Sequence, residues 1–268
     1  GLFFPGMGAL CVVDVSDPTA PQKVGLCDTH FPYDLSVSGS HAYIACSTLG
    51  ITGSFFVIDV STPSNPQRTG YYETLDCACD IYVSNSYAYL ADFRGGIKVI
   101  DVSTPSNPQM VGSCNPLAYA QGIYVSGSYA YVSDLFGFQV IDISKPSNPH
   151  EVGRCGTPWY ANDVHVSGSY AYVAAGDEGG GGLHIIDVSV RSNPREVGYC
   201  EIQRAATGIY VTGVYAYVAA GDAGLRVIRV FSHSNPQEVG HWDGYARDVY
   251  VSGSHAYVAS NHKLHVID

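Results

Sequence analysis

The chain has 268 residues, of which 46% are hydrophobic and only 14% are charged, so it can bury a sizeable core and does not resemble a disordered chain. Its formal net charge is −11, and no basic run that could neutralise phosphates occurs, which argues against nucleic acid as a partner. No window approaches the roughly 20 apolar residues of a membrane span, so no span is expected in this segment.

Two phrases recur along the chain. The octet VSGSYAYV stands at 125–132 and again at 166–173, and near copies of it occur four more times. The second phrase is represented by KVIDVSTPSNPQMVG (98–112) and QVIDISKPSNPHEVG (139–153). The copies follow one another at about 42 residues, a spacing typical of propeller blades and solenoid coils.

Each repeat is predicted to contain four short strands. In one copy, DVHVSG (163–168) and YAYVAA (170–175) alternate apolar and polar residues around a tight SGS turn, which indicates a hairpin. A glycine-rich connection leads to LHIIDVS (183–189), and a Ser-Asn-Pro turn leads to REVGYC (195–200). No helical period intervenes. The sequence therefore predicts an all-β protein, a β-propeller of four-stranded antiparallel blades, with residues 1–268 in a single domain.

The number of blades depends on how the two ends are interpreted. Inner strands begin six times, whereas the VID-type third strand appears seven times. We expect seven blades if both incomplete ends form separate blades. The alternative is six, in which the strand at 22–28 completes the last blade and residues 1–13 are redundant. Because Gly1 is no natural start and the chain stops within a repeat, we also expect it to be a fragment of a longer protein.

The octet carries pairs of tyrosines two residues apart, such as Tyr129 and Tyr131, or Tyr170 and Tyr172. Residues two apart lie on the same face of a strand. Since the pairs recur with the period of the scaffold, we expect them to pack one blade against the next rather than to bind sugars.

The recurring phrase AYVA-x-GL-x-VIDVS-x-PSNP-x-EVG resembles the LVIVD repeat, a propeller motif of bacterial and archaeal proteins, many of them extracytoplasmic or surface-attached. The resemblance implies the fold and an extracytoplasmic or cell-surface location, but it implies no shared activity or catalytic motif. Two residues depart from the pattern. Arg229 replaces the usual Asp, and His233 stands where other copies have Pro63 and Pro105, so we expect an irregular corner there.

One set of connections varies between repeats while the other is nearly constant. Recognition sites vary where a scaffold does not, so the variable face is the predicted binding face. We predict a non-catalytic interaction module that binds a protein or a surface glycan there, as part of a larger surface assembly. The candidate binding residues are the aromatic and Arg residues of these loops: Phe93, Arg94, Tyr119, Phe136, Trp159, Tyr160, Arg204, Tyr245 and Arg247.

Four acids share one repeat position, at the expected mouth of the central channel: Asp34, Asp80, Asp163 and Asp248. Carboxylates brought together there could bind a calcium-like ion, or each could accept backbone N–H bonds at a strand entrance. The second interpretation is preferred, so no cofactor is expected. The alternative function is an enzyme, a hydrolase or lyase, that uses these acids. No nucleophile, P-loop or dinucleotide motif occurs, and no catalytic residue is predicted.

The eight cysteines leave the redox compartment open. A symmetric hairpin centred near Thr19 would place Cys11 opposite Cys27, which makes them one candidate disulfide; Cys46 with Cys77 or Cys79 is another. The sequence CAC places Cys77 and Cys79 on one side of an extended strand, a signal for metal or redox chemistry that lacks any C-x-x-C partner motif.

Overall fold

The computed structural model describes residues 8–48, 52–74, 76–115, 119–177, 179–261 and 263–268. Every regular element among them is a β-strand. The chain divides into two compact units, the first comprising 1–125 with 143–150 and the second 126–142 with 151–268. The expectation of a single domain stays a prediction.

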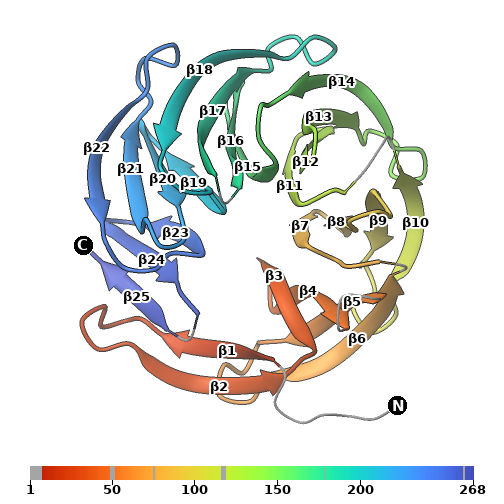
Figure 1. Ribbon diagram of the computed structural model, residues 1–268. Helices are drawn as coiled ribbons and strands as arrows, with labels where there is room; N and C mark the ends of the chain where they lie inside the picture. Colours follow the sequence, from red (N-terminus) through yellow and green to blue (C-terminus); the bar gives the residue numbers. More distant parts are fainter. Residues whose placement is uncertain (1–7, 49–51, 75, 116–118, 178, 262) are drawn as a thin grey trace. The chain divides into compact units, whose positions relative to one another are not determined.

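The first unit contains a two-stranded sheet, β1-β2, and two four-stranded sheets that follow the chain order, β3 to β6 and β7 to β10 (Figure 1). Their strands pair antiparallel. The strands are β1 (Ala9–Asp14), β2 (Gln22–Asp28), β3 (Phe31–Ser38), β4 (His41–Thr48), β5 (Thr52–Asp59), β6 (Gln67–Thr74), β7 (Asp80–Ser84), β8 (Tyr87–Ala91), β9 (Ile97–Asp101), β10 (Gln109–Cys114) and, up to Val125, β11 (Gly122–Ser126).

The second unit contains two further four-stranded sheets, β15 to β18 and β19 to β22, and a three-stranded sheet, β23-β24-β25. A fifth four-stranded sheet has the order β11-β12-β13-β14, and its later strands belong to this unit. The strands are β12 (Tyr129–Asp134), β13 (Gly137–Asp142), β14 (His150–Gly156), β15 (Ala161–Ser167), β16 (Tyr170–Asp177), β17 (Gly180–Asp187), β18 (Arg195–Ile202), β19 (Gly208–Thr212), β20 (Tyr215–Ala219), β21 (Leu225–Arg229), β22 (Gln237–Trp242), β23 (Asp248–Ser252), β24 (His255–Ala259) and β25 (Leu264–Ile267).

The fold class is that of an all-β propeller with four-stranded antiparallel blades. The expectation of seven blades is not confirmed, because the described residues form six sheets of three or four strands beside the small β1-β2 sheet. A count of six matches the alternative. The strand at 22–28, which is β2, pairs with β1, and the pairs include Leu10↔Cys27 and Val12↔Gly25. The N-terminal segment therefore makes its own small sheet.

The core lies between neighbouring sheets, as the alternating strands predict. On β15, Val164 and Val166 are buried, whereas Asp163 and His165, which alternate with them, are half-buried. The second tyrosine of the octet is the buried one in three blades: Tyr89, Tyr131 and Tyr172 are each at most 5% exposed. Tyr172 packs with Ile209 and Val218 of the next sheet. Tyr172 therefore packs blade against blade, as expected, and Tyr89 and Tyr131 are buried to a similar degree.

A glycine on each outer strand explains the Val-Gly of the repeat. A Cβ on Gly70 of β6 would lie 2.0 Å from the backbone oxygen of Pro105, in the β9–β10 turn of the following sheet. The equivalent distances are 2.1 Å from Gly112 to the Pro146 oxygen and 1.9 Å from Gly198 to the His233 oxygen. Real Cβ atoms do not approach a carbonyl oxygen this closely. The repeat requires glycine here because the neighbouring turn occupies the space of a side chain.

The expected irregularity after β21 is wrong. The turn keeps the Asn235 N–H bond to the Ser232 oxygen, at 3.0 Å, as the earlier turn keeps Asn65 N–H to Thr62 at 2.9 Å. His233 stacks on Tyr170 with ring centroids 3.6 Å apart, and its Nε2 lies 3.1 Å from the Tyr172 hydroxyl. Backbone hydrogen bonds hold the corner, so an Arg and a His are tolerated in it.

The proposed disulfide between Cys11 and Cys27 is also wrong. All eight cysteines are free thiols. Cys11 pairs with Leu26, and Cys27 pairs with Leu10, so the register differs by one residue from that of a hairpin centred on Thr19. A shift of one residue turns a side chain to the opposite face of the sheet, so the two sulfurs point away from each other.

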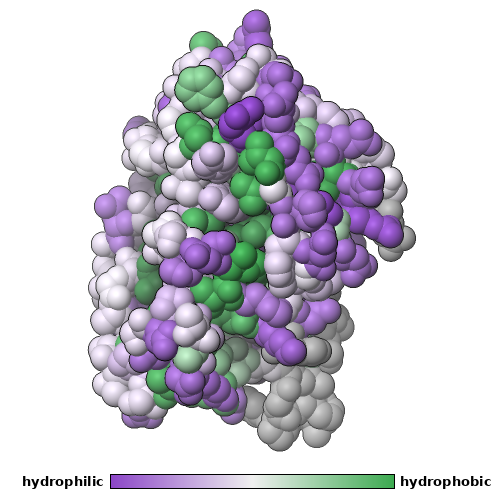
Figure 2. All heavy atoms as spheres, turned by 90° about the vertical axis from the view of Figure 1, so that its left-hand side faces the viewer, coloured by the Kyte–Doolittle hydropathy of each residue, from purple (hydrophilic) through white to green (hydrophobic). Residues whose placement is uncertain are grey.

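Apolar patches lie among the polar residues on the face shown in Figure 2. Exposed apolar side chains of the second unit include Val239 on β22, Tyr250 on β23 and Leu264 on β25. Each of these strands is the first or last of its sheet, where no neighbour covers one side. Within the described residues, no helix is long and apolar enough to cross a membrane.

Candidate functional site

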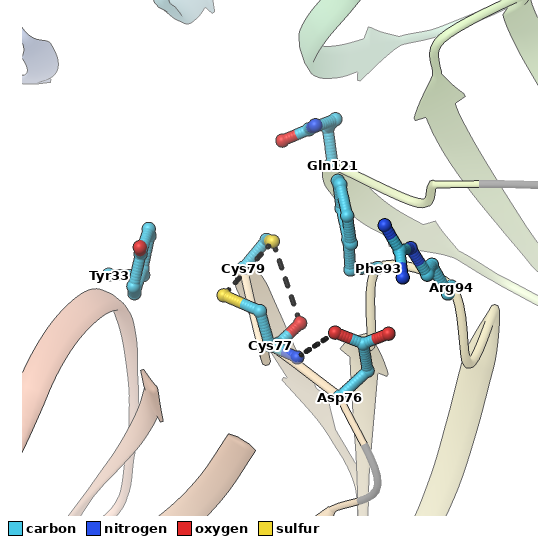
Figure 3. Close-up of a pocket in the computed structure, with 7 residues that line it drawn as sticks. All are labelled: Tyr33, Asp76, Cys77, Cys79, Phe93, Arg94 and Gln121. Atoms are coloured by element: carbon cyan, nitrogen blue, oxygen red, sulfur yellow. Dashed lines mark hydrogen bonds between the residues drawn. The ribbon is translucent and has the colours of Figure 1, made fainter. Parts of the chain in front are cut away.

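A pocket of about 500 Å³ opens in the first unit (Figure 3). It is built by the first residues of β3, by the loops that precede β7 and β11, and by the β8–β9 turn. Tyr33 faces the pocket from one side, and Phe93 and Gln121 face it from the other. The lining residues are Tyr33, Asp76, Cys77, Cys79, Phe93, Arg94 and Gln121.

Three predicted binding residues come together beside this pocket. The rings of Phe93 and Tyr119 meet edge to face, with centroids 4.8 Å apart. The guanidinium carbon of Arg94 lies 6.0 Å from the Phe93 centroid and 5.7 Å from that of Tyr119. Both rings are half-buried, while Arg94 is exposed. A cation above two aromatic rings beside an open pocket has the composition of a protein-binding hot spot.

The backbone of this rim is strained. Phe93 has φ of 37° and Tyr119 has φ of 61°, in the left-handed region that bulky residues rarely adopt. Antiparallel bridging holds the strained segments together, since the Ala120 N–H donates to the Phe93 oxygen at 3.0 Å. Such conformations cost about 1–3 kcal/mol each and cluster at binding sites. Glycine would relieve the strain but would remove the ring.

The other six predicted binding residues lie in the second unit, on four separate connections. Phe136 lies between β12 and β13 and is 67% exposed, and Tyr160, between β14 and β15, is 50% exposed. Trp159 stands next to Tyr160. Arg204 lies in the connection before β19, and Tyr245 and Arg247 lie in the connection before β23. Their side chains are exposed, except that of Trp159, which is half-buried. Their role in recognition stays a prediction.

The acids at the strand entrances accept backbone hydrogen bonds, and these bonds join neighbouring blades. In the first unit, Asp80 accepts from Ile81 N–H at 2.6 Å and, through its other oxygen, from Ile123 N–H on β11 at 2.6 Å. Asp34 accepts from Ile81 N–H at 3.2 Å.

The same arrangement recurs in the second unit. Asp163 accepts from Val164 N–H at 2.7 Å and from Ile209 N–H on β19 at 2.8 Å, and Asp248 accepts from Val249 N–H at 2.7 Å. Because these carboxylate oxygens already accept backbone N–H groups, the protein itself supplies their hydrogen-bond partners. The hydrogen bonds fit a structural role for these acids.

Replacing Asp163 by Asn should lower the free energy of unfolding by roughly 1.5 to 3 kcal/mol, because the amide NH₂ would face the Ile209 or Val164 N–H instead of accepting from it. Chemical denaturation measures the loss. Asp222, an exposed turn residue in the same unit, provides the control, and Asp222→Asn should change little. Equal losses in both variants would show that charge, rather than the amide bonds, matters.

Calcium binding by these acids is the alternative to their hydrogen-bonding role. Within the described ranges, no three His, Cys, Asp or Glu side chains gather so as to hold a metal ion. The hydrogen bonds above favour the interpretation without a cofactor. Calcium addition should then leave the melting temperature of the protein and of Asp163→Asn unchanged, whereas an ion bound to the folded state would raise it.

Five pocket residues were not among the candidates predicted from the sequence: Tyr33, Asp76, Gln121 and the two cysteines of the CAC segment. Tyr33 lies on strand β3, whereas Asp76, Gln121 and the two cysteines are neither aromatic nor Arg, so a prediction limited to aromatic and Arg loop residues does not include them. The spacing of Cys77 and Cys79 was the available signal. This spacing alone does not predict a site; the fold places both cysteines in the same pocket as Phe93 and Arg94.

Comparison with known proteins supports the repeat assignment. The model of the LVIVD repeat matches residues 6–29, 33–74, 77–116, 118–157, 159–201, 203–243 and 243–268. No curated protein sequence matches the chain. Among solved structures, a protein from Lactobacillus plantarum superposes with a TM-score of 0.81 at 13% identity, covering 99% of this chain and 92% of that one. The computationally designed Ika8 protein gives 0.67 at 12% identity, covering 91% and 74%. These likenesses show the fold alone, whereas the seven repeat matches show that the chain belongs to the LVIVD-repeat family.

Proposed function

We propose that the chain is a non-catalytic recognition module that binds a partner protein through its variable loops, with a surface glycan as the second ligand class. The strained pair Phe93 and Tyr119 carries this proposal. The energy that holds two bulky rings at positive φ is not recovered by burial, since both remain half-exposed beside the pocket. A binding partner would recover it by packing against the rings.

The charges around the pocket support a polar partner with an apolar anchor. Arg94 offers a cation above the rings, and Asp76 and Gln121 add an acceptor and an amide to the wall. Interface hot spots combine aromatic and Arg residues in this way. A pocket of about 500 Å³ is large enough for one side chain or a small sugar.

Amide hydrogen bonds occupy both oxygens of Asp80 and of Asp163, which favours binding over the hydrolase or lyase alternative. The LVIVD-repeat family, in which many members are extracytoplasmic or surface-attached, supports a surface location as part of a larger assembly. Labelling of intact cells with an impermeant reagent tests that location.

Partner capture from a surface extract, together with a glycan array, tests the function. The double variant Phe93→Ala, Arg94→Ala should weaken binding at least about thirtyfold, or about 2 kcal/mol. The double variant Trp159→Ala, Tyr160→Ala tests the variable loops of the second unit and should also weaken partner binding. Ser128→Ala, in a constant turn, serves as the control. A loss in the control equal to that in the variants would place recognition on the other set of loops.

The variant Tyr119→Gly separates binding from folding. Glycine adopts φ of 61° without strain, so the melting temperature should hold or rise while affinity falls. A lower melting temperature with unchanged affinity would show that the ring serves the fold.

A further inference from the structure

Two thiols face each other in the pocket of the first unit. The sulfur atoms of Cys77 and Cys79 lie 3.7 Å apart, and both residues line the pocket (Figure 3). Cys77 is 9% exposed, and Cys79 is half-buried. A disulfide bond is about 2.05 Å long, so the sulfurs must approach by about 1.7 Å to form one.

The backbone around the pair is held in place. Asp76 Oδ1 accepts from the Cys77 N–H at 2.8 Å, and the Cys79 N–H donates to the Ala91 oxygen at 2.8 Å. Gly53 of β5 packs directly below this segment, since a Cβ there would lie 1.9 Å from the Asp76 oxygen. The two sulfurs therefore face each other because the backbone of Asp76–Cys79 is fixed on both sides.

The surroundings shift the pKa values of the two thiols in opposite directions. The pKa of Cys77 is lowered to about 7, mainly because the Cys79 thiol donates a hydrogen bond to its sulfur. Burial opposes this shift, hydrogen bonds from the Ser47 and Tyr33 hydroxyls add to it, and the negative charge of Asp76 opposes it. The pKa of Cys79 is raised, first by its hydrogen bond to Cys77 and then by burial and nearby negative charge. One sulfur is thus a partial thiolate near neutral pH, and the other keeps its proton.

Other cysteines lack this arrangement. Burial raises the pKa of Cys46 to about 12 and also raises that of Cys27, Cys155 and Cys200. Thiolates are the reactive form of cysteine, and reactive cysteines lie in accessible sites with donors around the sulfur.

We propose that Cys77 and Cys79 form a redox-active dithiol that reduces low-molecular-weight disulfides entering this pocket, with Cys77 as the attacking sulfur and Cys79 as the resolving one. The apolar ring of Phe93 and the guanidinium of Arg94 suit a disulfide that carries an apolar part and a carboxylate. The proposal does not rest on the recognition function, which uses the rim rather than the sulfurs.

The reaction has two exchange steps. The Cys77 thiolate attacks one sulfur of the disulfide, the disulfide bond breaks, and one small thiolate leaves while a mixed disulfide forms on Cys77. Cys79 gives its proton to the departing thiolate and then attacks the Cys77 sulfur, which expels the second small thiolate. Two electrons pass from the protein sulfurs to the small disulfide. The products are an intramolecular Cys77–Cys79 disulfide, one small thiol and one small thiolate, which takes a proton from water.

The experiment uses the reduced chain with oxidised glutathione or the aromatic dithiobis-nitrobenzoate, followed by alkylation and mass mapping. The peptide that contains both cysteines should become two hydrogens lighter and carry no adduct. Cys79→Ala should stop at a stable mixed disulfide on Cys77, and Cys77→Ser should abolish the reaction at this peptide. Cys11→Ser, which removes an exposed thiol of the same unit, should leave it unchanged.

The pH profile gives a second readout. In the wild-type chain, alkylation of Cys77 should reach half its maximal rate near pH 7, and in Cys79→Ala the midpoint should move upward because the donating thiol is lost. A wild-type chain that accumulates a stable mixed disulfide, or a Cys77 midpoint equal to that of Cys11, would overturn the proposal. Both measurements on the wild-type chain remain decisive if a variant does not fold.

Discussion

Gly70→Ala should destabilise the protein by about 3 kcal/mol, although it adds a single methyl group. The new Cβ would lie 2.0 Å from the Pro105 oxygen and 3.2 Å from the Val57 Cβ, and neither is the flexible end of a side chain. The β9–β10 turn would have to move away from β6. Chemical denaturation of the wild type and the variant measures the loss.

Gly240→Ala is the matched control. Gly240 occupies the same position on β22, opposite Val227, as Gly70 occupies on β6, opposite Val57. A Cβ there would meet only the Val227 side chain, at 3.8 Å, among the described residues. We expect this variant to be neutral or more stable by about 0.4–1 kcal/mol, since alanine restricts the unfolded chain. Similar losses in both variants would attribute the effect to strand propensity rather than to the neighbouring turn.

Asp92→Asn should stabilise the protein at pH 7 by about 2 kcal/mol. The Asp92 carboxyl is fully buried, and within the described residues its oxygens have no hydrogen-bond partner. The Thr74 hydroxyl near it donates to the Asp76 oxygen instead, and Lys98 Nζ lies 3.9 Å away. Burial raises the pKa of Asp92 to about 6. An amide of the same shape removes the buried charge, at the cost of the attraction to Lys98.

The pH dependence gives the sign of this effect. Because the folded state holds the Asp92 proton more tightly than the unfolded state, the free energy of unfolding should fall as the pH rises from about 4 to about 6 and stay lower above it. The Asn variant should lack this fall. At the equivalent turn of the next blade, Asp134 accepts hydrogen bonds from the Phe136 N–H and the Gln139 amide. Asp134→Asn should therefore destabilise, and gains in both variants would refute the explanation.

The repeating part of the fold could be predicted from the sequence because each strand carries its own alternation and each turn its own Gly or Pro. The hydrogen-bonding role of Asp163 followed from its position at a strand entrance. The register of β1 and β2 could not be predicted, since neither the centre of the turn nor a one-residue bulge leaves a mark in the hydrophobic pattern, and Cys11 pairs with Leu26 instead of Cys27. The turn at His233 also escaped, because its backbone bonds do not depend on the side chains that changed.

The pocket was less predictable than the scaffold. Phe93, Arg94 and Tyr119 were chosen for residue type and loop position, and the structure brings these three together. Tyr33 on β3 and Cys77 in the loop before β7 lie more than forty residues apart in sequence, and only the folded repeats place them on one pocket. No sequence pattern predicts φ of 61° at Tyr119, because bulky residues rarely adopt it.

The contact between an outer-strand glycine and the next turn also bears on how such chains change in evolution. Except at Gly240, the outer-strand glycine of one repeat contacts the turn of the following repeat, as Gly70 and Pro105 illustrate. Unequal recombination that adds or removes a whole repeat joins a glycine of one copy to a turn of another, so every new junction has the old geometry. An insertion of part of a repeat would leave a glycine facing a strand. Copy number can therefore drift in whole repeats while the loops diversify independently.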